Sequence, residues 1–228
     1  YYVWDEAGKT ILFVQRPAQL VKSCLAILAG VFSFILFMVA VVLLASAIDK
    51  KDVTPYIVIP AIFLGFGATL AVIILLAPKR HVFFYRDDNK AELLLKVEQD
   101  QKFAPIVATY TVCAPSGVVL AKLRKNYLYN IFRKRWQILT PQGGVISIVK
   151  EDSILLSLLR RVLGPAFGLL RTNFVFFKGE TEQPIGEFNR KFTLLDRYVL
   201  DLSQDLESHI DPRIAVAAGV MLDTGERR

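Results

Sequence analysis

The densest group of basic side chains in the sequence lies between positions 122 and 136, with no acidic residue among them. Its members are Lys122, Arg124, Lys125, Arg133, Lys134 and Arg135, interleaved with Tyr127, Tyr129, Phe132 and Trp136. Basic side chains attract anionic lipid headgroups, at about 1 kcal/mol each near a membrane surface, and aromatic rings favour the interface. The same pattern suits single-stranded nucleic acid or the solvated face of a sheet. We expect contact with anionic lipid or an acidic partner protein, because no RNA-binding fingerprint accompanies the group.

A second basic pair, Arg160 and Arg161, belongs to a short helix predicted over residues 153–163. Apolar side chains recur on one side of this helix, the two arginines lie on the other, and Gly164-Pro165 ends it. Such a helix could lie in the bilayer interface or pack over a sheet. Both arginines therefore join Trp136 and the basic group as candidate lipid-binding or partner-binding residues.

The residue types that usually perform catalysis are scattered along the chain. The two histidines, His81 and His209, are far apart in the sequence. No Gly-x-Ser-x-Gly, Walker loop, Rossmann fingerprint or His-Glu-x-x-His motif occurs. We therefore predict that the protein is not an enzyme, has no catalytic residue and binds no cofactor.

Metal binding is not expected either. The acidic residues Asp201, Asp205, Glu207 and Asp211 lack the glycine and the bidentate glutamate of an EF-hand loop, so we interpret them as solvated loop residues. The two cysteines, Cys24 and Cys113, are too few for a zinc site with four cysteine ligands or a disulfide framework. We predict packing roles for both.

Two uncharged stretches, 23–48 and 53–78, indicate a membrane anchor. Each exceeds the roughly 20 residues that a helix needs to cross about 30 Å of hydrocarbon. Only residues 49–52 separate them, so we predict two antiparallel spans within a helical hairpin over 18–80. The mean hydropathy of +0.41 fits a membrane segment joined to a water-soluble part. Because the sequence begins at Tyr1, we expect a further N-terminal segment before it.

The flanks of these stretches predict their orientation. Arg16 and Lys22 precede the first, and Lys79, Arg80 and Arg86 follow the second, so the positive-inside rule places both termini in the cytoplasm. Neither stretch contains an Asp, Glu, Lys, Arg or His side chain for a proton relay or ion path. We expect an anchor, or a surface that packs against partner subunits. The net charge of +7 suits an anionic partner.

Short apolar segments separated by polar turns fill most of the remaining sequence and predict five β-hairpins. They pair 2–4 with 11–13, 81–85 with 93–97, 106–113 with 118–123, 136–139 with 145–149, and 174–177 with 185–188, and a last strand covers 197–202. The first hairpin precedes the helices but lies on the same side of the bilayer as the rest. We therefore expect one β domain, made of 1–17 and 81–228, with the helical hairpin inserted into it.

The end of the sequence predicts one more helix, over about 212–222. Asp211 is a suitable N-cap and Pro212 a suitable first residue. The nine apolar residues after Arg213 are too few to span a bilayer and leave no polar face, so this helix must be buried in protein.

This combination resembles the superfamily of phospholipid scramblases, LURP-one-related proteins and Tubby C-terminal domains. The resemblance covers 1–17 and 81–225. It rests on the hairpin Val3–Leu12, the strand Ile185–Phe188, and Asp211-Pro212-Arg213 before an Ala-rich helix that ends at Asp223. It implies a membrane-anchored α+β protein with an antiparallel barrel of about twelve strands around the C-terminal helix. The calcium-binding segment and palmitoylated cysteines of animal scramblases have no match here.

These observations predict a non-enzymatic, membrane-anchored module. We expect it to bind anionic membrane lipid or to serve as an accessory or assembly subunit of a membrane protein complex, without a nucleic-acid partner. The alternative that the resemblance implies is phospholipid scrambling between leaflets. Two helices without charged residues offer no groove for headgroups in a monomer, which argues against that alternative.

Overall fold

The computed structural model describes residues 1–17, 19–47, 54–131, 133–152, 173–191 and 197–226. The chain divides into two compact units. Residues 17–79 form a helical unit, and residues 1–16 together with 80–228 form a β unit. The helix predicted over 153–163, with Arg160 and Arg161, lies outside the described residues.

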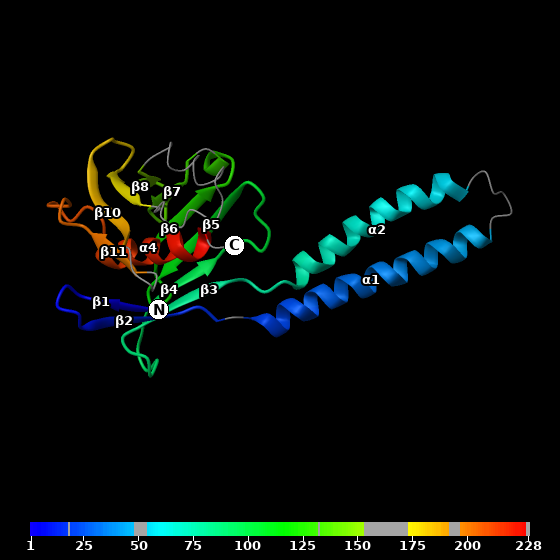
Figure 1. Cartoon of the computed structure of the whole chain (residues 1–228), viewed down its shortest axis with the longest axis horizontal. Helices are drawn as coiled ribbons and strands as arrows, with labels where there is room; N and C mark the ends of the chain where they lie inside the picture. The colour runs from blue at the N-terminus through cyan, green and yellow to red at the C-terminus, as the bar shows by residue number, and fades with distance from the viewer. Residues whose placement is uncertain (18, 48–53, 132, 153–172, 192–196, 227–228) are drawn as a thin grey trace. The chain divides into compact units, whose positions relative to one another are not determined.

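Within the described residues, the β unit contains an antiparallel sheet of eleven strands, in which each strand pairs with the next one along the chain (Figure 1). The strands are β1 Tyr2–Trp4, β2 Thr10–Gln15, β3 His81–Tyr85, β4 Leu93–Gln99, β5 Val107–Cys113, β6 Val119–Asn126, β7 Arg135–Leu139, β8 Val145–Glu151, β9 Phe174–Lys178, β10 Pro184–Lys191 and β11 Arg197–Asp201. The predicted hairpins are confirmed. Among the described residues no pairing joins β1 to β11, so the observed sheet is open where the prediction had a closed barrel.

The turns between paired strands follow from the residues at their centres. Gly8 and Gly117 have φ angles of 80° and 84°, which residues with a Cβ rarely adopt. The Gly117 amide donates to the Ala114 carbonyl oxygen at 2.9 Å, closing the turn between β5 and β6. The chain therefore reverses at the polar, glycine-containing positions that the sequence indicated.

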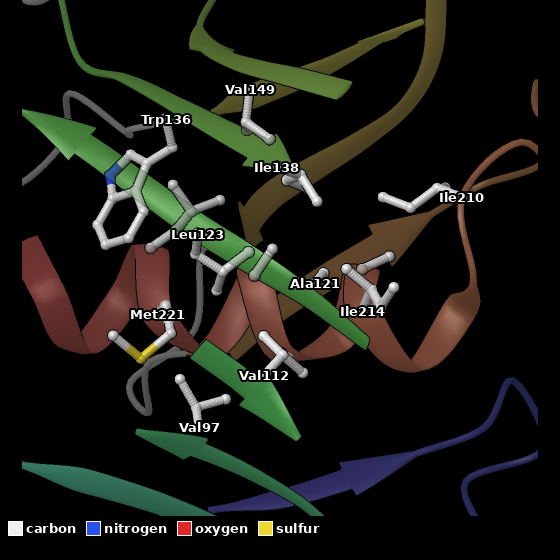
Figure 2. Close-up of a cluster of buried hydrophobic side chains, with 14 of the residues drawn as sticks. Val97, Val112, Ala121, Leu123, Trp136, Ile138, Val149, Ile210, Ile214 and Met221 are labelled. Atoms are coloured by element: carbon white, nitrogen blue, oxygen red, sulfur yellow. The ribbon is translucent and has the colours of Figure 1, made fainter. Parts of the chain in front are cut away.

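One face of the sheet forms the core of the β unit, together with α4 (Pro212–Glu226). Figure 2 shows Val97, Val112 and Leu123 from the sheet gathered with Ile214 and Met221 of this helix. Small residues bring the helix close to the strands: a Cβ added at Gly219 would lie 2.8 Å from the Phe188 ring. The helix begins at Pro212, as predicted. Its buried apolar residues are Ile214, Ala215, Ala217, Ala218, Met221 and Leu222, and Val216 and Val220 are partly buried.

The helical unit consists of α1 (Leu20–Ser46) and α2 (Thr54–Leu76), which lie side by side (Figure 1). Both are long and apolar enough to cross a membrane, by length and composition. At 1.5 Å rise per residue, α1 is about 40 Å long. Its outer side chains are apolar too, with Leu28 and Phe32 each 63% exposed. A helix that is apolar all round requires protein or lipid on every side.

Small residues form the seam between α1 and α2. Gly30 faces Ile73, and Gly65 faces Phe37; a Cβ added at Gly65 would lie 2.7 Å from the Phe37 ring. Gly67 has nothing within 4 Å of an added Cβ. Of these two neighbouring glycines of α2, only Gly65 lies in the seam.

Candidate functional site

The two ends of the sheet differ in what they connect. We call the end where β2 stops and β3 starts the attached end, because the chain leaves there for α1 and returns there from α2. The pairs His81 with Glu98, Glu98 with Thr111, and Thr111 with Lys122 show that the strands are staggered, because the level of His81 meets β6 at Lys122, before that strand ends at Asn126. The opposite end, which we call the turn end, holds the tight hairpin turns.

Basic side chains dominate the described connections at the attached end. They are Arg16, Lys79, Arg80, Lys102, Arg133 and Lys134, against the acidic Asp100 and Asp152. The adjoining strand ends contribute the basic Arg124 and Arg135 and the acidic Glu98, and the carboxylate of Glu151 is buried. The last turn of α4 adds Asp223 and Glu226. This end of the sheet therefore carries excess positive charge.

The turn end has the opposite composition. Its acidic residues are Asp5, Glu6, Asp87, Asp88, Glu92, Glu180, Asp205, Glu207 and Asp211, against the basic Lys9, Arg86, Lys90, Lys178 and Arg213. Glu182 belongs to the same connection as Glu180, but its carboxylate reaches Lys150 at 2.7 Å and interacts with Arg133 and Arg135. Helix α4 begins at Pro212, directly after Asp211, and its last turn reaches the attached end, where the Arg16 guanidinium donates to the Thr224 carbonyl oxygen at 3.2 Å. The positive and negative charges of the β unit are thus separated along the strand direction.

Three residues of the predicted basic group lie on the outward face of the sheet: Lys122, Arg124 and Arg135. Their strand neighbours Ala121, Leu123 and Trp136 are buried in the core, and alternation along each strand turns these basic side chains the other way. Arg124 is exposed, and within the described residues neither it nor Lys122 makes an ion pair. Arg135 pairs in register with Lys150, which bridges to Glu182 at 2.7 Å.

Lys125 and Trp136 do not belong to that outward face, which corrects the predicted group. Lys125 is 4% exposed and Trp136 is 2% exposed. The Lys125 ammonium lies 4.9 Å from the centroid of the Tyr127 ring and 5.4 Å from that of Trp136, and Tyr110 stacks on Trp136. The two residues are opposite each other in the β6–β7 register and both point inward, where they form cation–π contacts in the core.

Arg133 and Lys134 connect the start of β7 with the end of β8. The Arg133 Nε donates to the Glu151 carbonyl oxygen at 2.5 Å, and its Nη2 donates to the Asp152 carbonyl oxygen at 3.4 Å. The backbone amide of Lys134 donates to the buried Glu151 carboxylate at 3.4 Å. The Arg133 guanidinium therefore already has structural partners, whereas Arg124 is available to a ligand.

The acidic residues between β11 and α4 have local partners. Both oxygens of the Asp205 carboxylate accept backbone amides, from His209 and Ile210, each at 2.9 Å. Hydrogen bonding to Lys178 lowers the pKa of Glu207, and hydrogen bonding to the backbone amide of Ser203 lowers the pKa of Asp201. Among the described residues no group of three or more His, Cys, Asp or Glu side chains could hold a metal ion.

Sequence reasoning missed several residues at the attached end. Arg80 and Lys102 are exposed there, as are the apolar residues Phe103 and Leu128. The sequence did contain a signal for the two apolar residues, because each stands in a polar connection beside basic residues. Phe103 directly follows Lys102, and Leu128 lies within the basic group. Comparisons with family models, curated proteins and solved structures found no match to the chain.

Proposed function

We propose that this chain is a non-enzymatic, membrane-anchored module whose β unit binds anionic lipid headgroups at the attached end of the sheet. The separation of charge between the two ends carries this proposal. Only residues 16–19 lie between β2 and α1, and only residues 77–80 between α2 and β3. Four extended residues span at most about 14 Å. If α1 and α2 cross a bilayer, the basic end is the one that these connections keep near the headgroups.

Two finer features belong to the same proposal. Both ends of the chain lie in the cytoplasm, supported by Arg16, Lys79 and Arg80 beside the two helices. The sheet curves around α4 as a barrel that stays open between β1 and β11, supported by the core cluster that unites side chains from β2 to β10 with the helix. The described parts of α1 and α2 hold no charged side chain beyond Lys22, and nothing in them favours scrambling over anchoring.

The test compares lipid enrichment around the full-length chain in vesicles. Energy transfer from the tryptophans to dansyl-phosphatidylserine, divided by transfer to dansyl-phosphatidylcholine, reports the local preference for anionic lipid. Arg80→Gln with Arg124→Gln removes two exposed cations at the attached end. At about 1 kcal/mol for each, the preference is expected to fall about thirtyfold, and salt is expected to weaken the wild-type preference.

The matched control is Lys9→Gln with Lys90→Gln, which removes the same charge from exposed positions at the turn end. This variant is expected to retain the wild-type preference. Equal losses in the two double variants would indicate a net-charge effect without a binding surface. An unchanged preference in the Arg80/Arg124 variant would contradict lipid binding at this end and favour an acidic protein partner.

A further inference from the structure

The attached end exposes apolar side chains as well as basic ones. Phe103 is 60% exposed and Ile106 is 49% exposed in the connection between β4 and β5. Leu128 is 55% exposed and Tyr129 is 64% exposed in the connection between β6 and β7. We call these four side chains the apolar rim. Water is a poor environment for a group of large apolar side chains, so a surface that gathers them at one place indicates an interaction site.

One backbone hydrogen bond joins the two connections of the apolar rim, and two further bonds order the chain beside them. The Tyr127 amide donates to the Ile106 carbonyl oxygen at 2.8 Å and joins one connection to the other. The Leu128 amide donates to the Asn126 side chain at 2.9 Å and orders the bend that carries Leu128 and Tyr129. The Arg80 amide donates to the side chain of Gln99 at 2.9 Å, linking the residue before β3 to the start of the same region. The backbone that carries the apolar rim is therefore ordered by hydrogen bonds at this end of the sheet.

The charges around the apolar rim favour lipid over protein as the occupant. Lys102 directly precedes Phe103, Arg133 and Lys134 follow Tyr129 in the same connection, and Arg80 is tied to the rim through Gln99. Apolar and aromatic tips surrounded by cations match a bilayer surface, where the tips reach below the headgroups and the cations remain among the phosphates. The short connections to α1 and α2 leave from this same end.

We infer that the apolar rim inserts into the lipid–water interface of the membrane that α1 and α2 cross. This inference rests on the membrane anchoring in the proposed function, but not on selectivity for anionic lipid. Insertion is driven by burial of apolar surface, so it persists in neutral lipid and at high salt, where headgroup attraction is screened. The β unit is then held by its two connections, by charge and by its own apolar contacts.

The experiment places a tryptophan at the rim of the full-length chain and measures quenching by brominated lipid. Phe103→Trp is reconstituted in phosphatidylcholine vesicles whose acyl chains carry bromine near the headgroup. The parent chain supplies the background from Trp4 and Trp136. The added tryptophan is expected to be quenched several-fold more strongly than the background, with a blue-shifted emission that high salt does not reverse. Leu128→Trp is expected to behave in the same way.

Val118→Trp and Leu206→Trp are matched controls, because both positions are at the turn end and are 59% and 91% exposed. Neither is expected to respond to brominated lipid. A rim tryptophan that aqueous iodide quenches and bromine does not would show a solvated end and overturn the inference. Protection from both quenchers would show a protein occupant and also overturn it. Flotation of each variant with the vesicles shows whether the chain is bound to the membrane at all. It therefore distinguishes a rim that does not insert from a chain that α1 and α2 do not anchor.

Discussion

Neighbouring basic residues in this chain differ in exposure, because successive side chains along a strand point to opposite faces of the sheet. Arg124 is exposed on the outward face, whereas Lys125 points inward and lies against the rings of Tyr127 and Trp136. Composition alone placed both in one surface group. Ala121 and Leu123 of β6 are buried, and every second residue of a strand lies on the same face of the sheet. Lys125 therefore belongs to the core face. The prediction failed because it weighed charge before assigning faces.

Asp211 is the residue whose removal most directly tests the start of α4. Its carboxylate accepts the Arg213 backbone amide at 2.8 Å and so caps the helix. We expect Asp211→Ala to lower the free energy of unfolding by about 1 kcal/mol. The measurement is denaturant unfolding of the full-length chain in detergent, followed by tryptophan fluorescence. Glu180→Ala removes the same charge at the turn end and is expected to leave the stability unchanged.

The effect of Asp211 depends on pH with a defined sign. Hydrogen bonding to the Arg213 side chain lowers the pKa of Asp211 in the folded state. Its contribution is therefore complete above the unfolded value, near 4, and disappears as pH falls through the lower folded pKa. The difference in stability between wild type and Asp211→Ala is expected to be constant at neutral pH and to shrink in acid. A difference that grew in acid would contradict the assigned role of the ionised carboxylate.

At the scale of elements, the helical hairpin depends on contact at a few small residues. Lipid solvates apolar side chains as well as another helix does, so close packing must stabilise the pair. Gly65 lets α2 approach the ring of Phe37, and Gly30 lets α1 approach Ile73. Composition does not distinguish Gly65 from Gly67, because it cannot show which side of α2 meets α1.

The pair Gly65→Leu and Gly67→Leu tests this seam. Both substitutions add the same side chain and the same gain in helix propensity to α2. Gly65→Leu forces the Phe37 ring to move, so we expect it to destabilise the helix pair by about 1–3 kcal/mol. Gly67→Leu enters open space and is expected to have little effect. Titration of sodium dodecyl sulfate into micelles of the full-length chain measures the difference, and equal effects would contradict the seam.

The sequence predicted the elements better than their assembly. Strand positions followed from short alternating segments with glycine or asparagine turns, and α4 followed from Asp211 and Pro212. The order of the sheet also follows, because each strand pairs with its neighbour in sequence. Whether the edges β1 and β11 meet depends on twist and curvature summed over the whole sheet, which no local pattern encodes. The apolar rim was missed because Phe103 and Leu128 are single residues in connections that have no period.

At the scale of the whole molecule, the dipole of α4 is opposite in direction to the charge separation of the β unit. The amino-terminal end of the helix, with its partial positive charge, lies among the acids of the turn end, directly after Asp211. The carboxyl-terminal end meets the guanidinium of Arg16 at the attached end. Asp211 and Arg16 therefore interact favourably with the helix dipole, whereas Arg213 in the first turn and Asp223 and Glu226 in the last turn oppose it. The basic surplus lies at the end connected to α1 and α2.

The division of the chain into units also requires a specific topology. Residues 1–16 and 80–228 form one compact unit, although α1 and α2 separate them in the sequence. An even number of crossings is therefore needed. Lys9→Cys and Lys90→Cys are expected to react with a membrane-impermeant maleimide only after cells are permeabilised. Lys51→Cys, between the two helices in sequence, is expected to react in intact cells.

The parent chain provides the background for this labelling. Burial raises the pKa of the Cys113 thiol, so this thiol stays protonated and reacts slowly with maleimide. Because β1 and β2 pair with each other and β2 pairs with β3, Lys9 and Lys90 cannot lie on opposite sides of a membrane while the sheet is intact. Labelling of one from outside and the other from inside would therefore refute the joined sheet as well as the anchor. Labelling of all three from the same side would show that α1 and α2 do not cross the bilayer.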